Sequence, residues 1–147
     1  MKVFRFMSSD EFQKYQNGEK LENNTIHAAK TTAHGFCFLD LEEFDPEYSY
    51  HFLSGIVGTG VCAVFETKKK LKKATGTYAE VIPFEEFIKM STLEQFENMF
   101  NPKSIKVNEY CTNKYDKASF HLVKYCEDFH EKYFKNDKWE WKECTKN

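Results

Sequence analysis

The stretch of residues 34–67 constrains the fold more than any other part of this sequence. Two short apolar runs, residues 36–39 and 61–65, flank a helix start at Asp45-Pro46-Glu47. Continuous apolar runs of this length, rich in branched and aromatic residues, predict strands that are covered on both faces. Asp45 can accept a free backbone N–H of the first helical turn, and Pro46 lacks the N–H that would have no partner there. The negative charge of Glu47 suits the positive end of the helix dipole. We therefore expect a strand, a helix ending near Gly55 and a second strand to form the centre of the core.

The rest of the chain carries short elements of both kinds, which predicts an α+β fold. We expect further strands at residues 2–6, 78–82, 105–112 and 139–142, helices at 10–17, 83–90 and 91–100, and a loop at 23–32. Residues 120–134 begin like a strand and continue with a helical stripe, so a strand or loop should pass into a helix near Tyr125. With 147 residues the chain is most simply one domain, residues 1–147. We expect short split sheets, antiparallel or mixed, with flanking helices.

Composition and charge exclude several classes of protein. The hydrophobic fraction is 41% and the aromatic fraction 17%, which favours a packed globular domain over a disordered chain. The net charge of −2 provides no general attraction to nucleic acid or to a membrane, so we expect no direct binding to either. Because the sequence contains neither a membrane-spanning segment nor a signal-peptide core, we expect a cytoplasmic protein.

The cysteines are expected to be reduced structural thiols. Their number is odd, their spacings are wide, and no two are arranged as Cys-x-x-Cys. They are Cys37, Cys62, Cys111, Cys126 and Cys144. The histidines near Cys126, His121 and His130, match no established zinc spacing, and we expect no metal.

The sharpest charge feature is the lysine-rich segment Lys68–Lys73, which follows an expected strand directly. Such a segment is typical of a solvated hairpin turn, or of lysines that guard a sheet edge against further pairing. The functional alternative is a contact for phosphate or for an acidic partner. Since the chain has no basic surplus elsewhere, we favour the structural interpretation.

Two charged residues lie inside expected strands: Arg5 in VFRF and Glu109 in VNEY. A charge within a strand needs either solvent on one face of the sheet or a partner. They are either outward-facing positions of a half-exposed sheet or members of one cleft. In a cleft, the guanidinium would hold an anionic ligand bidentately and the carboxylate would stabilise a developing cation.

The order of elements and these short motifs resemble the ADP-ribosyltransferase fold, especially the small versions found in phages and mobile elements. The resemblance rests on Arg5 in KVFRFMS, on Thr31, Thr32 and Phe36 in TTAHGFCF, and on Glu109 in IKVNEYCT. It implies NAD as the cofactor and places Arg5, Thr31, Thr32, Phe36 and Phe38 around it. Arg5 would position the anionic part of NAD, and Phe36 or Phe38 would stack near the nicotinamide. Glu109 would stabilise the positive charge that grows on the ribose as nicotinamide leaves.

Three functions follow as hypotheses. The first is an NAD-dependent ADP-ribosyltransferase-like protein that modifies a host macromolecule. Many such enzymes carry Gln or Glu where this chain has Val107, so arginine is not the expected acceptor. The second is a non-catalytic phage or mobile-element protein that binds and inhibits a host defence complex, of protein alone or of protein and nucleic acid, as anti-CRISPR proteins do. The third is a nucleic-acid binder that uses Lys68–Lys73.

Overall fold

The structure is a computed structural model that describes residues 1–22, 35–50, 60–79, 82, 84–135 and 137–144. In the described residues the strands are β1 (Lys2–Met7), β2 (Phe36–Asp40), β3 (Val61–Thr67), β4 (Lys72–Ala79), β5 (Ser104–Thr112), β6 (Phe120–Cys126) and β7 (Lys142–Glu143). The helices are α1 (Ser9–Gln16), α3 (Phe84–Phe87), α4 (Thr92–Phe100) and α5 (Phe129–Phe134). Residues 46–50 form a further helical turn. The α+β fold class is confirmed.

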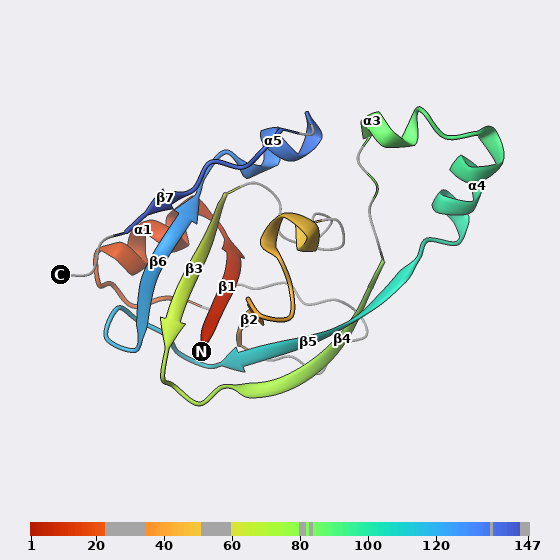
Figure 1. The fold of residues 1–147 in the computed structure, drawn as a ribbon. Helices are drawn as coiled ribbons and strands as arrows, with labels where there is room; N and C mark the ends of the chain where they lie inside the picture. The colour runs from red at the N-terminus through yellow and green to blue at the C-terminus, as the bar shows by residue number, and fades with distance from the viewer. Residues whose placement is uncertain (23–34, 51–59, 80–81, 83, 136, 145–147) are drawn as a thin grey trace.

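The strands form a seven-stranded open sheet in the order β4-β5-β2-β1-β3-β6-β7, and each described pairing is antiparallel. Strand β2 joins the two halves of the sheet. It pairs with β1 through Leu39 and Asp40, but with β5 through residues 36–38. Figure 1 shows that β1, β3 and β6 run at a large angle to β4 and β5. Instead of the expected short split sheets, the described strands thus form one open sheet, in which β1 and β2 pair through only two residues each.

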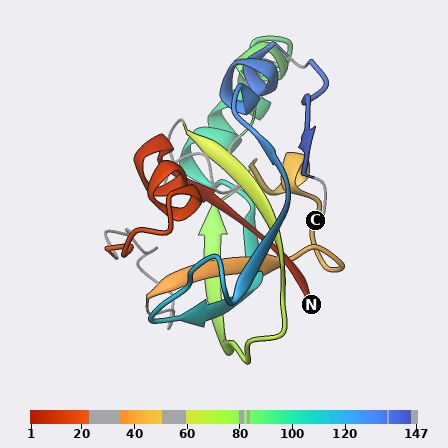
Figure 2. The ribbon, with the colours of Figure 1, turned by 90° about the vertical axis from the view of Figure 1, so that its left-hand side faces the viewer.

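Apolar side chains cover both faces of the sheet, as the continuous runs predict. Because alternate residues of a strand point to opposite faces, β1, β2, β3 and β6 each contribute buried side chains to both layers. The α1-side cluster comprises Val3, Met7, Phe12, Tyr15, Phe36, Phe38, Val61, Ala63, Phe65, Tyr115 and Phe120. The α5-side cluster comprises Phe4, Phe6, Leu39, Tyr50, Cys62, Val64, Tyr78, Val107, Cys126, Phe129 and Trp139. Figures 1 and 2 show α1 apart from the helical turn at 46–50 and from α5.

Local capping explains where the helices begin. Ser8, Asp45 and Ser91 each accept a backbone N–H from the residue three positions later. These bonds satisfy donors that have no partner within the helix itself. The expected helix starts are therefore confirmed, whereas the expected end near Gly55 lies outside the described residues. The loop expected at residues 23–32 also lies outside them.

Two glycines allow close approach between backbones at strand ends. Gly35 has a φ of 76°, and a Cβ there would lie 2.5 Å from the carbonyl oxygen of Thr112. A Cβ on Gly60 would lie 2.1 Å from the carbonyl oxygen of Met7. Any larger residue at either position would push neighbouring strands apart.

The structure corrects four boundaries. The fourth strand was expected at 78–82 but runs from Lys72 to Ala79, because the long strand β5 pairs with all eight of its residues. The fifth helix begins at Phe129, since residues 120–126 continue as strand β6 along β3. The third helix is only Phe84–Phe87 rather than 83–90, and the terminal strand is Lys142–Glu143 rather than 139–142. In the described part of the chain, no helix is both long enough and apolar enough to span a bilayer.

We expect Phe65→Ala to lower the free energy of unfolding by about 3–5 kcal/mol, because it empties a volume at the centre of the α1-side cluster. Phe65 is 0% exposed, and its ring centroid lies 5.1 Å from that of Tyr15 and 5.9 Å from that of Phe120. Urea denaturation followed by fluorescence measures the change. The matched control is Phe96→Ala on α4, where the side chain is 57% exposed. A change within about 0.5 kcal/mol is expected for the control, and equal losses in both variants would contradict the described packing.

Candidate functional site

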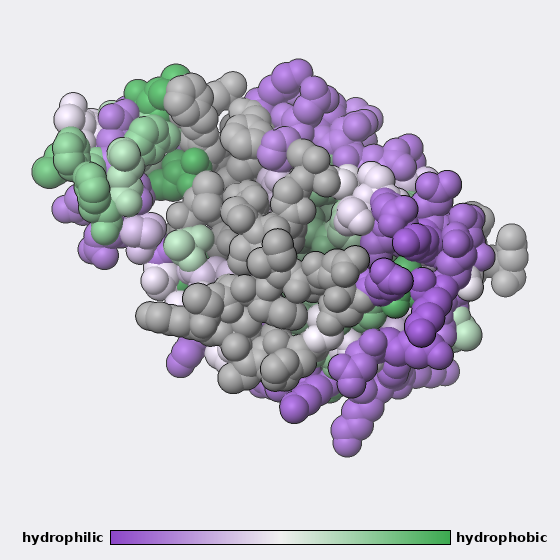
Figure 3. Space-filling view, turned by 180° about the vertical axis from the view of Figure 1, so that it is seen from behind, coloured by the Kyte–Doolittle hydropathy of each residue, from purple (hydrophilic) through white to green (hydrophobic). Residues whose placement is uncertain are grey.

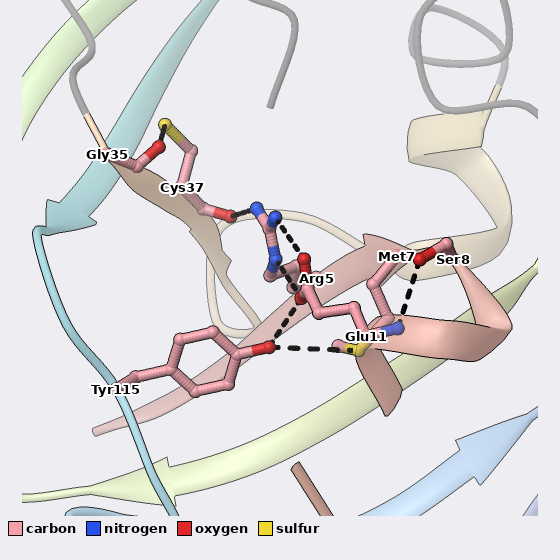
Figure 4. Close-up of polar contacts among 7 residues, drawn as sticks. All are labelled: Arg5, Met7, Ser8, Glu11, Gly35, Cys37 and Tyr115. Atoms are coloured by element: carbon pink, nitrogen blue, oxygen red, sulfur yellow. Dashed lines mark hydrogen bonds and ion pairs between the residues drawn. The ribbon is translucent and has the colours of Figure 1, made fainter. Parts of the chain in front are cut away.

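Arg5 lies where β1 and β2 diverge, and its guanidinium bridges the gap. Its Nη1 donates to the carbonyl oxygen of Cys37 at 3.1 Å (Figure 4). Its Nε and Nη2 donate to the two carboxylate oxygens of Glu11 at 2.8 Å and 2.9 Å. Such a two-point contact fixes the guanidinium in orientation as well as in position. Arg5 therefore ties the start of α1 to the middle of β2.

The first turn of α1 delivers Glu11 to this position. Ser8 caps the helix by accepting the backbone N–H of Glu11, which fixes the direction of the Glu11 side chain. The hydroxyl of Tyr115 donates to the same carboxylate, at 2.5 Å from Oε2. Burial opposes the charge on Arg5, but the Glu11 carboxylate outweighs it, and the pKa of the guanidinium is raised. Burial and the Glu11 charge both raise the pKa of the Tyr115 hydroxyl.

Aromatic rings complete the surroundings of Arg5. Its guanidinium carbon lies 5.2 Å from the ring centroid of Phe36 and 5.9 Å from that of Phe38, within the range of cation–π attraction. The structure therefore brings together three of the residues that the resemblance places around NAD. It also shows that Glu11, Cys37 and the two rings already engage the guanidinium.

Glu109 occupies a second polar position, on β5. It is 6% exposed, and the hydroxyl of Tyr78 on the paired strand β4 donates to its Oε1 at 2.5 Å. Burial first, and then the bond to Glu109, raise the pKa of the Tyr78 hydroxyl. A buried carboxylate is costly unless hydrogen bonds compensate it, so Tyr78 supports Glu109 directly. Arg5, at 7% exposed, is buried as well. Neither charged residue therefore occupies an outward-facing position of a half-exposed sheet.

The two charged residues do not share a cleft, because they leave the sheet on opposite faces. Arg5 alternates with Phe4 and lies with the α1-side cluster. Glu109 follows Val107 by two residues and therefore points to the face of the α5-side cluster. Cys37 of β2 lies between the two charges. Its carbonyl oxygen accepts from Arg5, while its thiol contacts Cys111, two residues after Glu109.

The remaining expected cofactor residues, Thr31 and Thr32, lie outside the described residues. Comparison of the chain with models of known protein families finds no match, and comparisons with curated proteins and with solved structures find none either. Among the described residues, no three His, Cys, Asp or Glu side chains gather as metal ligands would.

The lysine-rich segment forms the β3–β4 turn and the start of the edge strand β4. Lys72 and Lys73 pair with β5 and are exposed, which is the position of lysines that protect a sheet edge. Lys69 donates from Nζ to the carbonyl oxygen of Lys114. Beside the turn is an open hollow of about 400 Å³, lined by Glu66, Thr67, Lys68, Lys69, Ala118, Ser119 and His121. An acidic and several basic groups share this lining, so the hollow has no single charge preference.

Sequence reasoning missed the partners of both charged residues. Glu11 carried a usable signal, because Ser8-x-x-Glu11 is a capping-box pattern and places a carboxylate in the first helical turn. For Tyr78 and Tyr115 the sequence contains no such signal. Each reaches its carboxylate only through pairing or packing of distant segments, 31 residues apart for Tyr78 and Glu109 and 104 for Tyr115 and Glu11.

We expect Glu11→Ala to lower the free energy of unfolding by about 3 kcal/mol, because it leaves the Arg5 charge buried without its carboxylate. The two side chains are 6% and 14% exposed. Asp10→Ala is the matched control, since Asp10 is also an acidic residue of the first turn of α1 but forms an exposed ion pair with Lys14. Its unfolding midpoint should hardly move. If Glu11→Ala unfolded at the wild-type urea concentration, Arg5 would not depend on this ion pair.

Proposed function

We propose that the chain is an NAD-dependent ADP-ribosyltransferase-like protein of the cytoplasm that modifies a host macromolecule, with Glu109 as its catalytic carboxylate. The observation that carries the proposal is the position of Glu109, a carboxylate buried in an otherwise apolar sheet face. Burying a charge there costs stability, which favours a functional reason for its presence. The strands that the resemblance names, β1, β2 and β5, are also consecutive neighbours in the sheet.

The chemistry that NAD would supply is a glycosidic bond to nicotinamide, whose cleavage builds positive charge on the ribose. Glu109 suits the stabilisation of that charge, since a carboxylate in surroundings of low polarity attracts a cation strongly. Tyr78 donates to Oε1 and so holds the carboxylate in one orientation. Only an interaction that strengthens as the charge develops accelerates the reaction.

Within this proposal, Arg5 is a positioning residue. Its guanidinium faces away from Glu109 and is bound by Glu11, so it holds β2 beside β1. Val107, which occupies the position of the acceptor-orienting residue in many related enzymes, is 0% exposed and belongs to the core. This burial supports an acceptor other than arginine.

We expect Glu109→Gln to reduce transfer from labelled NAD by about 100-fold or more while the protein stays folded. Glutamine is isosteric and still accepts the Tyr78 hydrogen bond, so the loss reports the charge. The matched control is Glu43→Gln, because Glu43 also accepts from a tyrosine hydroxyl, that of Tyr110, but is exposed. Calorimetric titration with NAD measures binding in parallel. Full transfer by the Glu109→Gln protein, or no binding at millimolar NAD, would rule the proposal out.

A second candidate function is favoured by the apolar face of α4. This helix buries none of its residues, and its large side chains Leu93, Phe96, Met99 and Phe100 are 72%, 57%, 65% and 75% exposed. It lies at the end of the β4–β5 ribbon, away from the rest of the sheet (Figure 1), and Figure 3 shows apolar surface at this end. Exposed apolar patches of this kind mark interaction sites. The second candidate is therefore a non-catalytic inhibitor that docks α4 against a host protein complex.

For this candidate, we expect the wild type to retain a host protein complex on purification, and we expect the double variant Leu93→Ser, Phe100→Ser to lose it while keeping the unfolding midpoint of the wild type. Both side chains are exposed, so their replacement removes apolar contact area without opening a cavity. The control is Glu97→Gln on the same helix. Quantitative mass spectrometry of purified complexes measures retention. Identical retention by the double variant and the control would exclude α4 as the docking face.

A further inference from the structure

The register of the sheet places four of the five cysteines opposite one another in two pairs. Cys37 of β2 pairs with Cys111 of β5, and Cys62 of β3 pairs with Cys126 of β6. Directly opposed residues of antiparallel strands have Cα atoms about 4.5–5.5 Å apart. A disulfide requires about 4.4–6.8 Å, so the backbone at both pairs suits a bond between the sulfurs.

The first pair is already in side-chain contact. The sulfur atoms of Cys37 and Cys111 lie 3.4 Å apart, and one thiol donates to the other. Bond formation requires an approach of about 1.4 Å, to a sulfur–sulfur length of about 2.05 Å. Rotation of the two side chains supplies a movement of this size without displacement of the strands.

Access to solvent separates the two pairs. Cys37 is half-buried, whereas Cys62 and Cys126 are 0% and 1% exposed within the α5-side cluster. A small oxidant should therefore react with Cys37 rather than with the second pair. All five cysteines are thiols in this structure, so the bond would be a modification of the state described here.

We propose that Cys37 and Cys111 form a reversible disulfide when the protein meets a low-molecular-weight disulfide such as oxidised glutathione. The thiolate of Cys37 attacks one glutathione sulfur, and the first reduced glutathione leaves. The thiolate of Cys111 then attacks the Cys37 sulfur of the mixed disulfide, and the second reduced glutathione leaves. The two protons of the protein thiols pass to the two departing glutathione thiolates, so the protein is oxidised by two electrons and the reagent is reduced by two.

The contact with Cys111, followed by burial, raises the pKa of the Cys37 thiol. The thiolate is therefore scarce at neutral pH, and the reaction should accelerate as the pH rises.

The bond would connect β2 to β5 between the two buried charges. The carbonyl group of Cys37 accepts from Arg5, and Cys111 lies two residues after Glu109 on the same face. A covalent bond at this position fixes the distance between β5, which carries Glu109, and β2, whose Cys37 carbonyl oxygen accepts from Arg5 of β1. An effect of the bond on ADP-ribosyl transfer rests on the proposed function, whereas formation of the bond does not.

The experiment exposes the folded Cys144→Ser protein to oxidised glutathione, because Cys144 is also partly exposed and would otherwise react. The expected product is about 2 Da lighter than the reduced protein. Peptide mapping should assign the bond to Cys37 and Cys111, and dithiothreitol should restore the starting mass. In addition, the oxidised protein should unfold at a higher urea concentration, since the bond closes a loop between residues 74 positions apart.

Cys111→Ser and Cys62→Ser, each in the same background, are the matched controls. The first removes the resolving thiol and should stop at a mixed disulfide on Cys37, whereas the second should still form the bond. Three results would overturn the proposal: a mixed disulfide that persists on Cys37 while Cys111 is present, a Cys62–Cys126 bond formed at an equal rate, or no change in mass. NAD binding is measured on the same samples, so a protein that forms the bond but ignores NAD refutes only the enzymatic function.

Discussion

The contact between Arg5 and Glu11 holds the two halves of the sheet together. Beyond Phe4 and Leu39, β1 and β2 no longer pair, and the guanidinium takes over the connection through the Cys37 carbonyl. Glu11 keeps this cation in place, and the capping bond to Ser8 keeps Glu11 in place. A feature of local sequence, a serine before a helix, thus positions a buried charge that joins two halves of a domain.

Strand β2 is the element that both halves share, and this explains the separation of the two polar positions. One face of β2 presents Phe36 and Phe38 to Arg5, and the other face directs Cys37 towards β5. On a single face, the buried charges of Arg5 and Glu109 would have attracted each other directly. On opposite faces, each has its own tyrosine: Tyr115 supports the Arg5–Glu11 pair, and Tyr78 supports Glu109.

Local signals in the sequence predicted local structure well. The caps at Ser8, Asp45 and Ser91 act within three residues, and the apolar runs define β2 and β3. Features that depend on distant pairing could not be predicted. Strand β4 extends back to Lys72 because β5 offers partners along its whole length. The opposite directions of Arg5 and Glu109, and the meeting of Cys37 with Cys111, follow from register alone. No spacing along the chain encodes register directly.

Because helix α4 projects from the sheet, the residues that stabilise the fold and the residues of the exposed apolar face are different ones. Folding depends on the two buried clusters, to which α4 contributes no residue. Changes of side chain on this helix therefore have little effect on the stability of the sheet. The exposed apolar face of α4 is therefore carried by a helix that contributes nothing to the two clusters on which folding depends.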